Sequence, residues 1–311
     1  MKEQVVVIAL GGNALGYNYE EQRKAVEGTA LIISDLIEEG FKVVLTHGNG
    51  PQVGMIQTAM DELNQIYSMY TQVPMPSCVA MSQGYIAFEL QRAIKAELEK
   101  RNIQKNIVSI LTQVGVDAND PAFEHPTKPI GRFMSKEEAR IMEKQGLKCM
   151  EDAGRGYRLT VASPKPKKII ELDVIQRLID EGDLVIACGG GGIPVAEKGG
   201  ELEGISAVID KDFVSALLAK EIGADFLVIL TAVEKIAINF GKKNQQWLES
   251  MSLDEADAYI KQEQFAPGSM LPKVEAAMEF AASGMNRRAL ITLLGKAREG
   301  LLGKTGTVIY K

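Results

Sequence analysis

Short apolar runs rich in β-branched residues alternate with longer segments of helical periodicity, and this alternation is the strongest constraint on the fold. In the first half, strand-like runs at 5–10 and 42–46 are each followed by a helical pattern, at about 20–39 and after Pro51. This order is typical of βαβ units. Because the strand-like runs are almost wholly apolar, we expect them to be buried on both faces of a mostly parallel sheet with helices on either side, an α/β fold.

The second half repeats the pattern. Strand-like runs lie at 183–188 and 225–231 and recur as RALIT and TVIY near the C-terminus. Helices are expected from about Ser206 to Ile222 and near 252–264 and 272–284. Between the halves, residues 112–168 are rich in Pro, Gly, Asp and Asn, which predicts an insertion or lid. We therefore expect one domain over 1–311, with this lid inserted within it, and with an N-terminal lobe of about 1–180 and a C-terminal lobe of about 181–311.

Composition excludes several classes of protein. The 311 residues are 46% hydrophobic, as in a folded globule, and the formal net charge of −6 argues against binding nucleic acid or anionic lipid by bulk charge. Three cysteines without paired spacing predict neither a disulfide framework nor a cysteine zinc site and favour a reducing compartment. The N-terminal apolar run of about six residues is too short for a signal sequence or membrane span, so a cytoplasmic location is expected.

Three glycine-rich loops, at 11–15, 47–54 and 189–195, each follow a strand-like run. Glycines at a strand end let the backbone approach a ligand, and the N-terminus of a following helix favours anions. A single loop of this kind can equally be a tight turn, and none of the three matches a standard nucleotide fingerprint. Ligands of open α/β sheets bind at the carboxyl ends of the strands, so the three loops together predict a ligand site there.

Three lysines occupy unusual positions. Lys273 directly follows a proline at an expected helix start, with Ser269 as a plausible cap, and Lys211 and Asp212 fall in the first turns of another helix. A cation there opposes the helix dipole by roughly 0.3–1 kcal/mol unless an anion lies nearby. Lys128 lies between prolines in the lid segment. Each could also be an ordinary solvated lysine, the usual case for that residue.

Only two histidines are present, His47 and His125, so a histidine triad or a histidine metal cluster has little to draw on. We expect His47 to cap the loop at its strand end. Arg155 and Arg158, in the lid segment, could clamp a phosphate or lie on the lid surface.

The chain also carries, in this order, the strings GGNAL, THGNGPQVG, NDPAFEHPTKPIG, EDAGRGY, SPKP, GGGGIPV, AVIDKDF, INFGK and FAPGSMLPKVEAA. Together they resemble the carbamate kinase family of the amino acid kinase superfamily over about residues 4–311. The LTAVEKIAINFG stretch and the short segment between Gly16 and Gln22 look most like a carbamate-kinase-like subgroup of purine and allantoin-type catabolism. The resemblance implies a three-layer α/β/α sandwich with an open sheet of about eight strands, a small protruding lid, and a homodimer.

The resemblance also implies a reaction, ATP plus carbamate to ADP plus carbamoyl phosphate, often run towards ATP in nitrogen or arginine catabolism. Its expected ligands are small molecules and ATP or ADP with Mg²⁺, with no dedicated metal ligands in the chain. The implied catalytic residues are Lys128, Lys211, Asp212 and Lys273. Those implied for the carbamate and phosphoryl side are Gly11, Gly12, Asn13, Gly48, Asn49, Gly50 and Arg158. Those implied for the nucleotide are Gly190, Gly191, Thr231, Ala232, Val233, Asn239, Gly241 and Met270.

One stretch departs from the family pattern. After Arg158 the family usually continues with another basic residue and two valines, whereas this chain has Leu159, Thr160, Val161 and Ala162. The change suggests a weaker hold on phosphate or a different acceptor. Two alternatives to a carbamate kinase therefore stay open: a related kinase acting on another small acid, and a nucleotide-binding protein without turnover.

Overall fold

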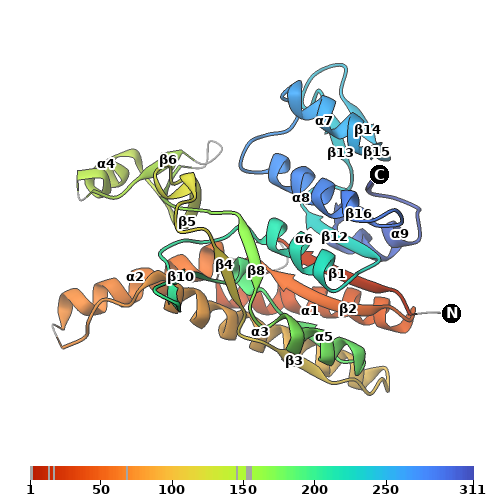
Figure 1. Cartoon of the computed structure of the whole chain (residues 1–311), viewed down its shortest axis with the longest axis horizontal. Helices are drawn as coiled ribbons and strands as arrows, with labels where there is room; N and C mark the ends of the chain where they lie inside the picture. The colour runs from red at the N-terminus through yellow and green to blue at the C-terminus, as the bar shows by residue number, and fades with distance from the viewer. Residues whose placement is uncertain (1–2, 13–14, 17, 68, 145, 152–155) are drawn as a thin grey trace.

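An eight-stranded sheet forms the centre of the computed structural model, which describes residues 3–12, 15–16, 18–67, 69–144, 146–151 and 156–311 (Figure 1). In spatial order its strands are β15 (Ser250–Ser252), β17 (Thr307–Tyr310), β16 (Arg288–Leu293), β12 (Phe226–Thr231), β1 (Val5–Leu10), β2 (Lys42–His47), β9 (Leu184–Ile186) and β3 (Ile107–Ser109). All neighbours are parallel except β16 and β17. The predicted open, mostly parallel sheet is confirmed.

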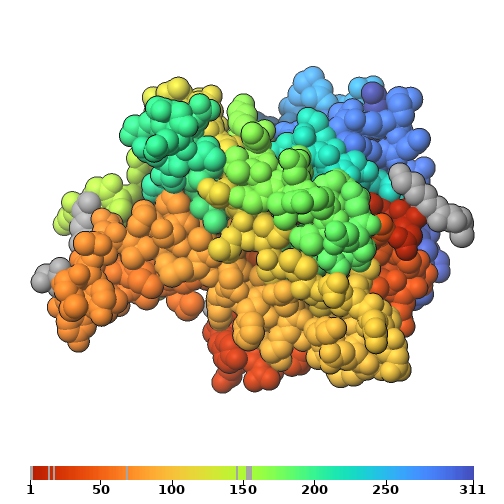
Figure 2. Space-filling model, turned by 60° about the horizontal axis from the view of Figure 1, so that its bottom comes forward, coloured from red at the N-terminus to blue at the C-terminus, as the bar shows by residue number. Residues whose placement is uncertain are grey.

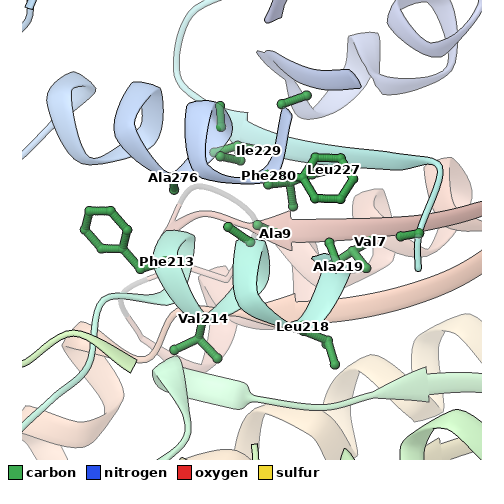
Figure 3. Close-up of a cluster of buried hydrophobic side chains, with 14 of the residues drawn as sticks. Val7, Ala9, Phe213, Val214, Leu218, Ala219, Leu227, Ile229, Ala276 and Phe280 are labelled. Atoms are coloured by element: carbon green, nitrogen blue, oxygen red, sulfur yellow. The ribbon is translucent and has the colours of Figure 1, made fainter. Parts of the chain in front are cut away.

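Helices cover both faces of this sheet. One face packs against α1 (Tyr19–Glu38), α3 (Met75–Lys100) and the short α9 (Ala297–Leu301). The other packs against α5 (Leu172–Asp180), α6 (Lys211–Glu221), α7 (Leu253–Lys261) and α8 (Met270–Ala282). The side chains of β1 alternate between the two cores, and Figure 3 shows Val7 and Ala9 beneath α6 and α8. The predicted three-layer α/β/α sandwich is thus present.

Smaller elements surround the sandwich. A second sheet has the order β11 (Glu201–Gly204), β10 (Ile193–Lys198), β4 (Gln113–Val116), β8 (Pro166–Ile169), and a hairpin joins β13 (Ile236–Ile238) to β14 (Gln246–Leu248). Short 3₁₀ turns are η2 (Pro121–Phe123), η3 (Gly189–Gly191) and η4 (Leu294–Lys296). A third sheet has the order β5 (Lys128–Met134), β7 (Tyr157–Val161), β6 (Cys149–Glu151) and, with α4 (Lys136–Lys144), forms what we call the lid.

The lid is smaller than the 112–168 segment, whose two ends contribute β4 and β8 to the second sheet. It crosses α2 (Gly50–Ile66), which projects in orange from one end of the molecule in Figure 2. At the crossing, a Cβ atom on Gly54 would lie 2.1 Å from the Cα of Gly131, which itself has a φ of +70°. Gly54 is required because the two backbones touch, and Gly131 because its positive φ favours glycine. The division into lobes near residue 180 stays a prediction.

Two helix starts differ from the expectation. The helix expected from about Ser206 begins at Lys211, because Asp210 caps it: Oδ1 of Asp210 accepts the backbone N–H of Asp212 at 2.9 Å. Ser269 does occupy the N-cap position of α8, but its side chain makes no capping hydrogen bond with the described residues of the first turn.

Candidate active site

The centre of the candidate site is Asp212, a carboxylate that is only 2% exposed. Its Oδ1 accepts a hydrogen bond from Nζ of Lys211 at 2.5 Å, and its Oδ2 accepts one from Nζ of Lys273 at 2.9 Å. Lys211 and Asp212 come from the first turn of α6 and Lys273 from the first turn of α8. The structure therefore brings two helix N-termini and two lysines to one carboxylate.

The charged groups of this cluster shift one another's pKa values. Burial by itself would raise the pKa of Asp212, but the two neighbouring ammonium groups outweigh it and hold that pKa well below its usual value. Burial lowers the pKa of Lys211, and the nearby ammonium of Lys273 adds to that effect. Burial also opposes the charge of Lys273, yet Asp212 raises its pKa above the ordinary value. Lys211 is therefore the lysine whose charge depends most on Asp212.

Lys128 joins this cluster from the lid. It is the first residue of β5, and its Nζ donates a hydrogen bond to Oδ2 of Asp210. Burial would raise the pKa of Asp210, but the charge of Lys128 outweighs it and lowers that pKa. Asp210 thus caps α6 with one oxygen and binds the lid lysine with the other. The three lysines and two aspartates leave one net positive charge, which suits an anionic ligand.

Sequence reasoning missed Asp210, although a signal for it exists. An aspartate directly before a charged residue and an apolar run is a common N-cap pattern. Placing the helix start near Ser206 put Asp210 inside the helix and hid this role.

The glycine loop after β2 lies beside Lys211 and leaves the sheet next to the end of β1. The two strands pair in parallel with Leu10 opposite His47, so their loops leave the sheet together. A Cβ on Gly48 would lie 3.4 Å from Cδ of Lys211, and one on Gly50 would lie 3.7 Å from Nη2 of Arg158. Gly11 lies against β12, whereas Gly12 is exposed, with open space where a Cβ would point. Asn13 and Arg155 fall outside the described residues.

Other predicted residues point into the protein. The side chain of Asn49 is 3% exposed and donates to Oγ of Ser82 on α3 at 2.9 Å. Gly190 and Gly191 are buried, and Cβ atoms on them would lie 2.1 Å from Nδ2 of Asn49 and 2.1 Å from the carbonyl oxygen of Ile209. These glycines are required by close packing within the chain.

The other residues that the sequence predicts to bind the nucleotide come later in the chain than Gly190 and Gly191. Thr231 ends β12, with Ala232 and Val233 directly after it. The other three are Asn239 and Gly241, at the β13–β14 connection, and Met270, which begins α8. The backbone N–H groups of Asn239 and Gly241 donate to the side chains of Gln264 and Gln245. Their role towards a nucleotide stays a prediction.

The departure after Arg158 has a structural explanation. Arg158 donates from Nε to the carbonyl of Gly131 at 3.1 Å, and its guanidinium lies 5.3 Å from the ring centroid of Phe133. Leu159 instead packs with an apolar cluster that includes Val53 and lines a cavity of about 430 Å³ between α2 and the lid. Leu159 therefore fills space between the lid and α2.

His47 caps its strand-end loop as expected. It is 1% exposed, its Nδ1 lies 2.9 Å from the carbonyl oxygen of Gly48, and burial lowers its pKa to about 4. It is therefore neutral at physiological pH and takes no part as a charged group.

The carboxylates of the site do not fit a resident metal ion. Asp210 and Asp212 are both engaged by lysines, and the described residues contain no group of three or more His, Cys, Asp or Glu side chains placed to hold one. Likewise, none of the helices in the described part of the chain is long and apolar enough to cross a membrane.

Comparison with known proteins agrees with this fold. The model of the amino acid kinase family matches residues 4–292, so the chain belongs to the amino acid kinase family. It is 57% identical over 304 residues to the carbamate kinase-like protein YqeA of Escherichia coli (strain K12), covering 98% of both chains. It is 50% identical over 314 residues to a carbamate kinase of Clostridium perfringens, covering 98% of this chain and 99% of the relative.

Solved structures give the same result. A carbamate kinase from Giardia lamblia bound to AMP-PNP superposes with a TM-score of 0.90 at 42% identity, covering 100% of this chain and 99% of the other. The amino acid kinase fold predicted from the ordered motifs is thereby confirmed. None of these names bears on purine or allantoin catabolism, and that placement stays a prediction.

Proposed function

We propose that this chain is a carbamate kinase, which transfers a phosphoryl group reversibly between ATP and carbamate. The observation that carries the proposal is the buried cluster in which Asp212 holds Lys211 and Lys273 together while Asp210 holds Lys128 beside them. Carbamate kinases from several organisms, similar to this chain over nearly their whole length, support the choice of substrate.

The cluster suits this reaction for a physical reason. The attacking oxygen of carbamate is already anionic and needs no general base, so a site without a titrating histidine is sufficient. Repulsion between the two anions contributes to the barrier, by about 4 kcal/mol for unit charges at 4 Å and an effective dielectric near 20. Phosphoryl transfer is generally catalysed by positioning and electrostatics, which Lys211, Lys273 and Lys128 would provide.

The remaining parts of the site have roles in the same proposal. The 48–50 loop and Arg158 would hold carbamate and the phosphoryl group, since Gly48 adjoins Lys211 and Gly50 adjoins Arg158. Thr231 and the residues around Asn239 would border the nucleotide, as the AMP-PNP complex of the Giardia lamblia enzyme makes reasonable for this fold. Mg²⁺ would enter with the phosphates of ATP or ADP. A cytoplasmic homodimer working in arginine or other nitrogen catabolism completes the proposal.

An ATP-forming assay tests it. Purified protein with ADP, Mg²⁺ and carbamoyl phosphate is expected to form ATP, detected by luciferase, and Lys211→Ala is expected to abolish it. ATP formation no faster than in Lys211→Ala would contradict the proposal.

The same assay separates the alternatives. Acetyl phosphate as a competing donor, and a panel of amino acid carboxylates as acceptors for ATP, would reveal a kinase for another small acid. ADP binding without turnover in either direction would indicate a nucleotide-binding protein. Trp247, the single tryptophan and 51% exposed on β14, provides a fluorescence signal for binding.

A further inference from the structure

Gln83 on α3 is a buried glutamine that bonds to two separate backbone segments. Its Nε2 donates to the carbonyl of Gly189 at 2.8 Å and to that of Thr112 at 3.2 Å, and its Oε1 accepts the N–H of Thr112 at 3.0 Å. The side chain is 3% exposed. A further hydrogen bond joins the same two segments, because Oγ1 of Thr112 accepts the N–H of Cys188, the residue before Gly189, at 2.9 Å. The η3 turn is thus fixed to α3 and to the start of β4.

The preceding residue on α3, Ser82, holds the other glycine loop. Its Oγ accepts a hydrogen bond from Asn49 and donates one to the carbonyl of Val79 at 2.6 Å. Ser82 is fully buried and Asn49 nearly so. Two consecutive residues of one helix therefore bind both loops, and we call this pair the α3 clamp.

The η3 turn has no free space on the side that faces His47 and the 48–50 loop. A Cβ on Gly189 would lie 2.4 Å from Nε2 of His47, and one on Gly190 would lie 2.1 Å from Nδ2 of Asn49. On its other side, a Cβ on Gly191 would lie 2.1 Å from the carbonyl oxygen of Ile209, the residue before Asp210. Interiors this closely packed transmit a displacement instead of absorbing it.

We propose that Gln83, through the η3 turn, is a positioning residue that sets the distance between the 48–50 loop and Lys211 at the start of α6. The proposal rests on the assignment of that loop to carbamate and carbamoyl phosphate. The closely packed glycines of η3 then carry a displacement of the turn, once it is released from α3, to the 48–50 loop. The expected consequence is selective: loss of the clamp weakens the acceptor side, while the nucleotide side near Thr231 and Asn239 is unaffected.

The test is a kinetic comparison of matched glutamine variants on α3. Gln83→Met keeps the length of the side chain and removes all three hydrogen bonds. Gln91→Met is the control, because Nε2 of Gln91 donates to the carbonyl of Ile107 at 2.8 Å, two helical turns away from the clamp. Both remove a hydrogen bond from the same helix to a neighbouring backbone, so a loss of helix packing alone would affect both alike.

The expected result is a separation of the two substrates. In Gln83→Met the KM for carbamoyl phosphate rises about tenfold, the effect of one lost buried hydrogen bond, while the KM for ADP changes less than about twofold. Gln91→Met leaves both values unchanged. Ser82→Ala, which releases only Asn49, is expected to show the same selectivity to a smaller degree. Equal changes for both substrates in Gln83→Met, or no change in either, would overturn the proposal.

Two further measurements keep the result interpretable. If Gln83→Met does not fold, Ser82→Ala decides by the same criterion. If the wild type forms no ATP, the proposed function fails by itself, and the clamp is tested by calorimetric binding of carbamoyl phosphate. Weaker binding to Gln83→Met than to Gln91→Met then supports the clamp, and equal binding, or none to the wild type, overturns it.

Discussion

Asp212→Asn isolates the charge that holds the lysine cluster together. Asparagine keeps the shape of the side chain but leaves Lys211 and Lys273 without the carboxylate that lies 2.5 and 2.9 Å from their Nζ atoms. The side chains of the two lysines are only 12% and 18% exposed, so their charges are poorly solvated once the carboxylate is removed. Lys211 responds most, because burial already lowers its pKa.

The size of the effect follows from the burial. Removing one partner of a buried ion pair costs about 3–5 kcal/mol. The charged forms of the two lysines bear this cost, so the pKa of Lys211 falls further below its ordinary value, and a growing fraction of the protein lacks that positive charge as the pH rises. We expect kcat at pH 8 to fall at least about 100-fold, the usual loss when one electrostatic group is removed.

The assay is ATP formation from carbamoyl phosphate between pH 6 and pH 9. In Asp212→Asn the residual kcat is expected to decline as the pH rises, at lower pH values than in the wild type. The control is Asp257→Asn, which removes an exposed partner 2.6 Å from Lys261 and is expected to leave the profile unchanged. A profile in Asp212→Asn parallel to that of the wild type would refute the reasoning.

Three other predictions concern stability and the lid. Because burial lowers the pKa of His47 to about 4, below its unfolded value near 6.5, the unfolded state binds the extra proton first and stability falls as the pH drops through this window. Urea unfolding at pH 5 and 7 should show a loss of about 2 kcal/mol that His47→Gln lacks. Asp210→Asn should raise the KM for carbamoyl phosphate with little change in melting temperature, since Asn still caps α6, whereas Asp210→Ala should lower both affinity and melting temperature. Gly54→Ala should lower the melting temperature because of its contact with Gly131, whereas Gly28→Ala, with open space around it, should raise it.

The sheet could be predicted because its strands are apolar over their whole length. The run at 5–10 became β1 with the expected ends, and β2 and β12 differ from their expected ranges by one residue. Such strands are buried on both faces, so little but a parallel sheet can accommodate them. The short strands of the lid are only partly buried and mixed in composition, and the looser 112–168 segment gave no sign of their boundaries.

The site could be predicted only in part. Lys211 and Lys273 stood out because a cation at a helix start is unusual, and Lys128 because it lies between prolines. The ordered motifs then implied catalytic roles for these lysines and for Asp212. The contacts of Gln83 and Ser82 had no such signal, because a buried polar residue on a helix looks like a surface one until its partners are known. Nor does a run of glycines show whether it is kept for a ligand or for neighbouring side chains. At Gly190 the structure shows the second reason.

The crossing of Gly54 and Gly131 is the point about which a rigid α2 would turn. Gly50, the last residue of the 48–50 loop, is the first residue of the helix, and Gly54 follows one turn later, about 6 Å along the axis. Beyond Gly54, twelve further residues of α2 extend about 18 Å to Ile66. A rigid helix that turns at Gly54 would convert a displacement of a few tenths of an ångström at Gly50 into one about three times larger at Ile66. If α2 turns in this way, we expect a spin label at exposed Ile66 to report occupancy of the 48–50 loop.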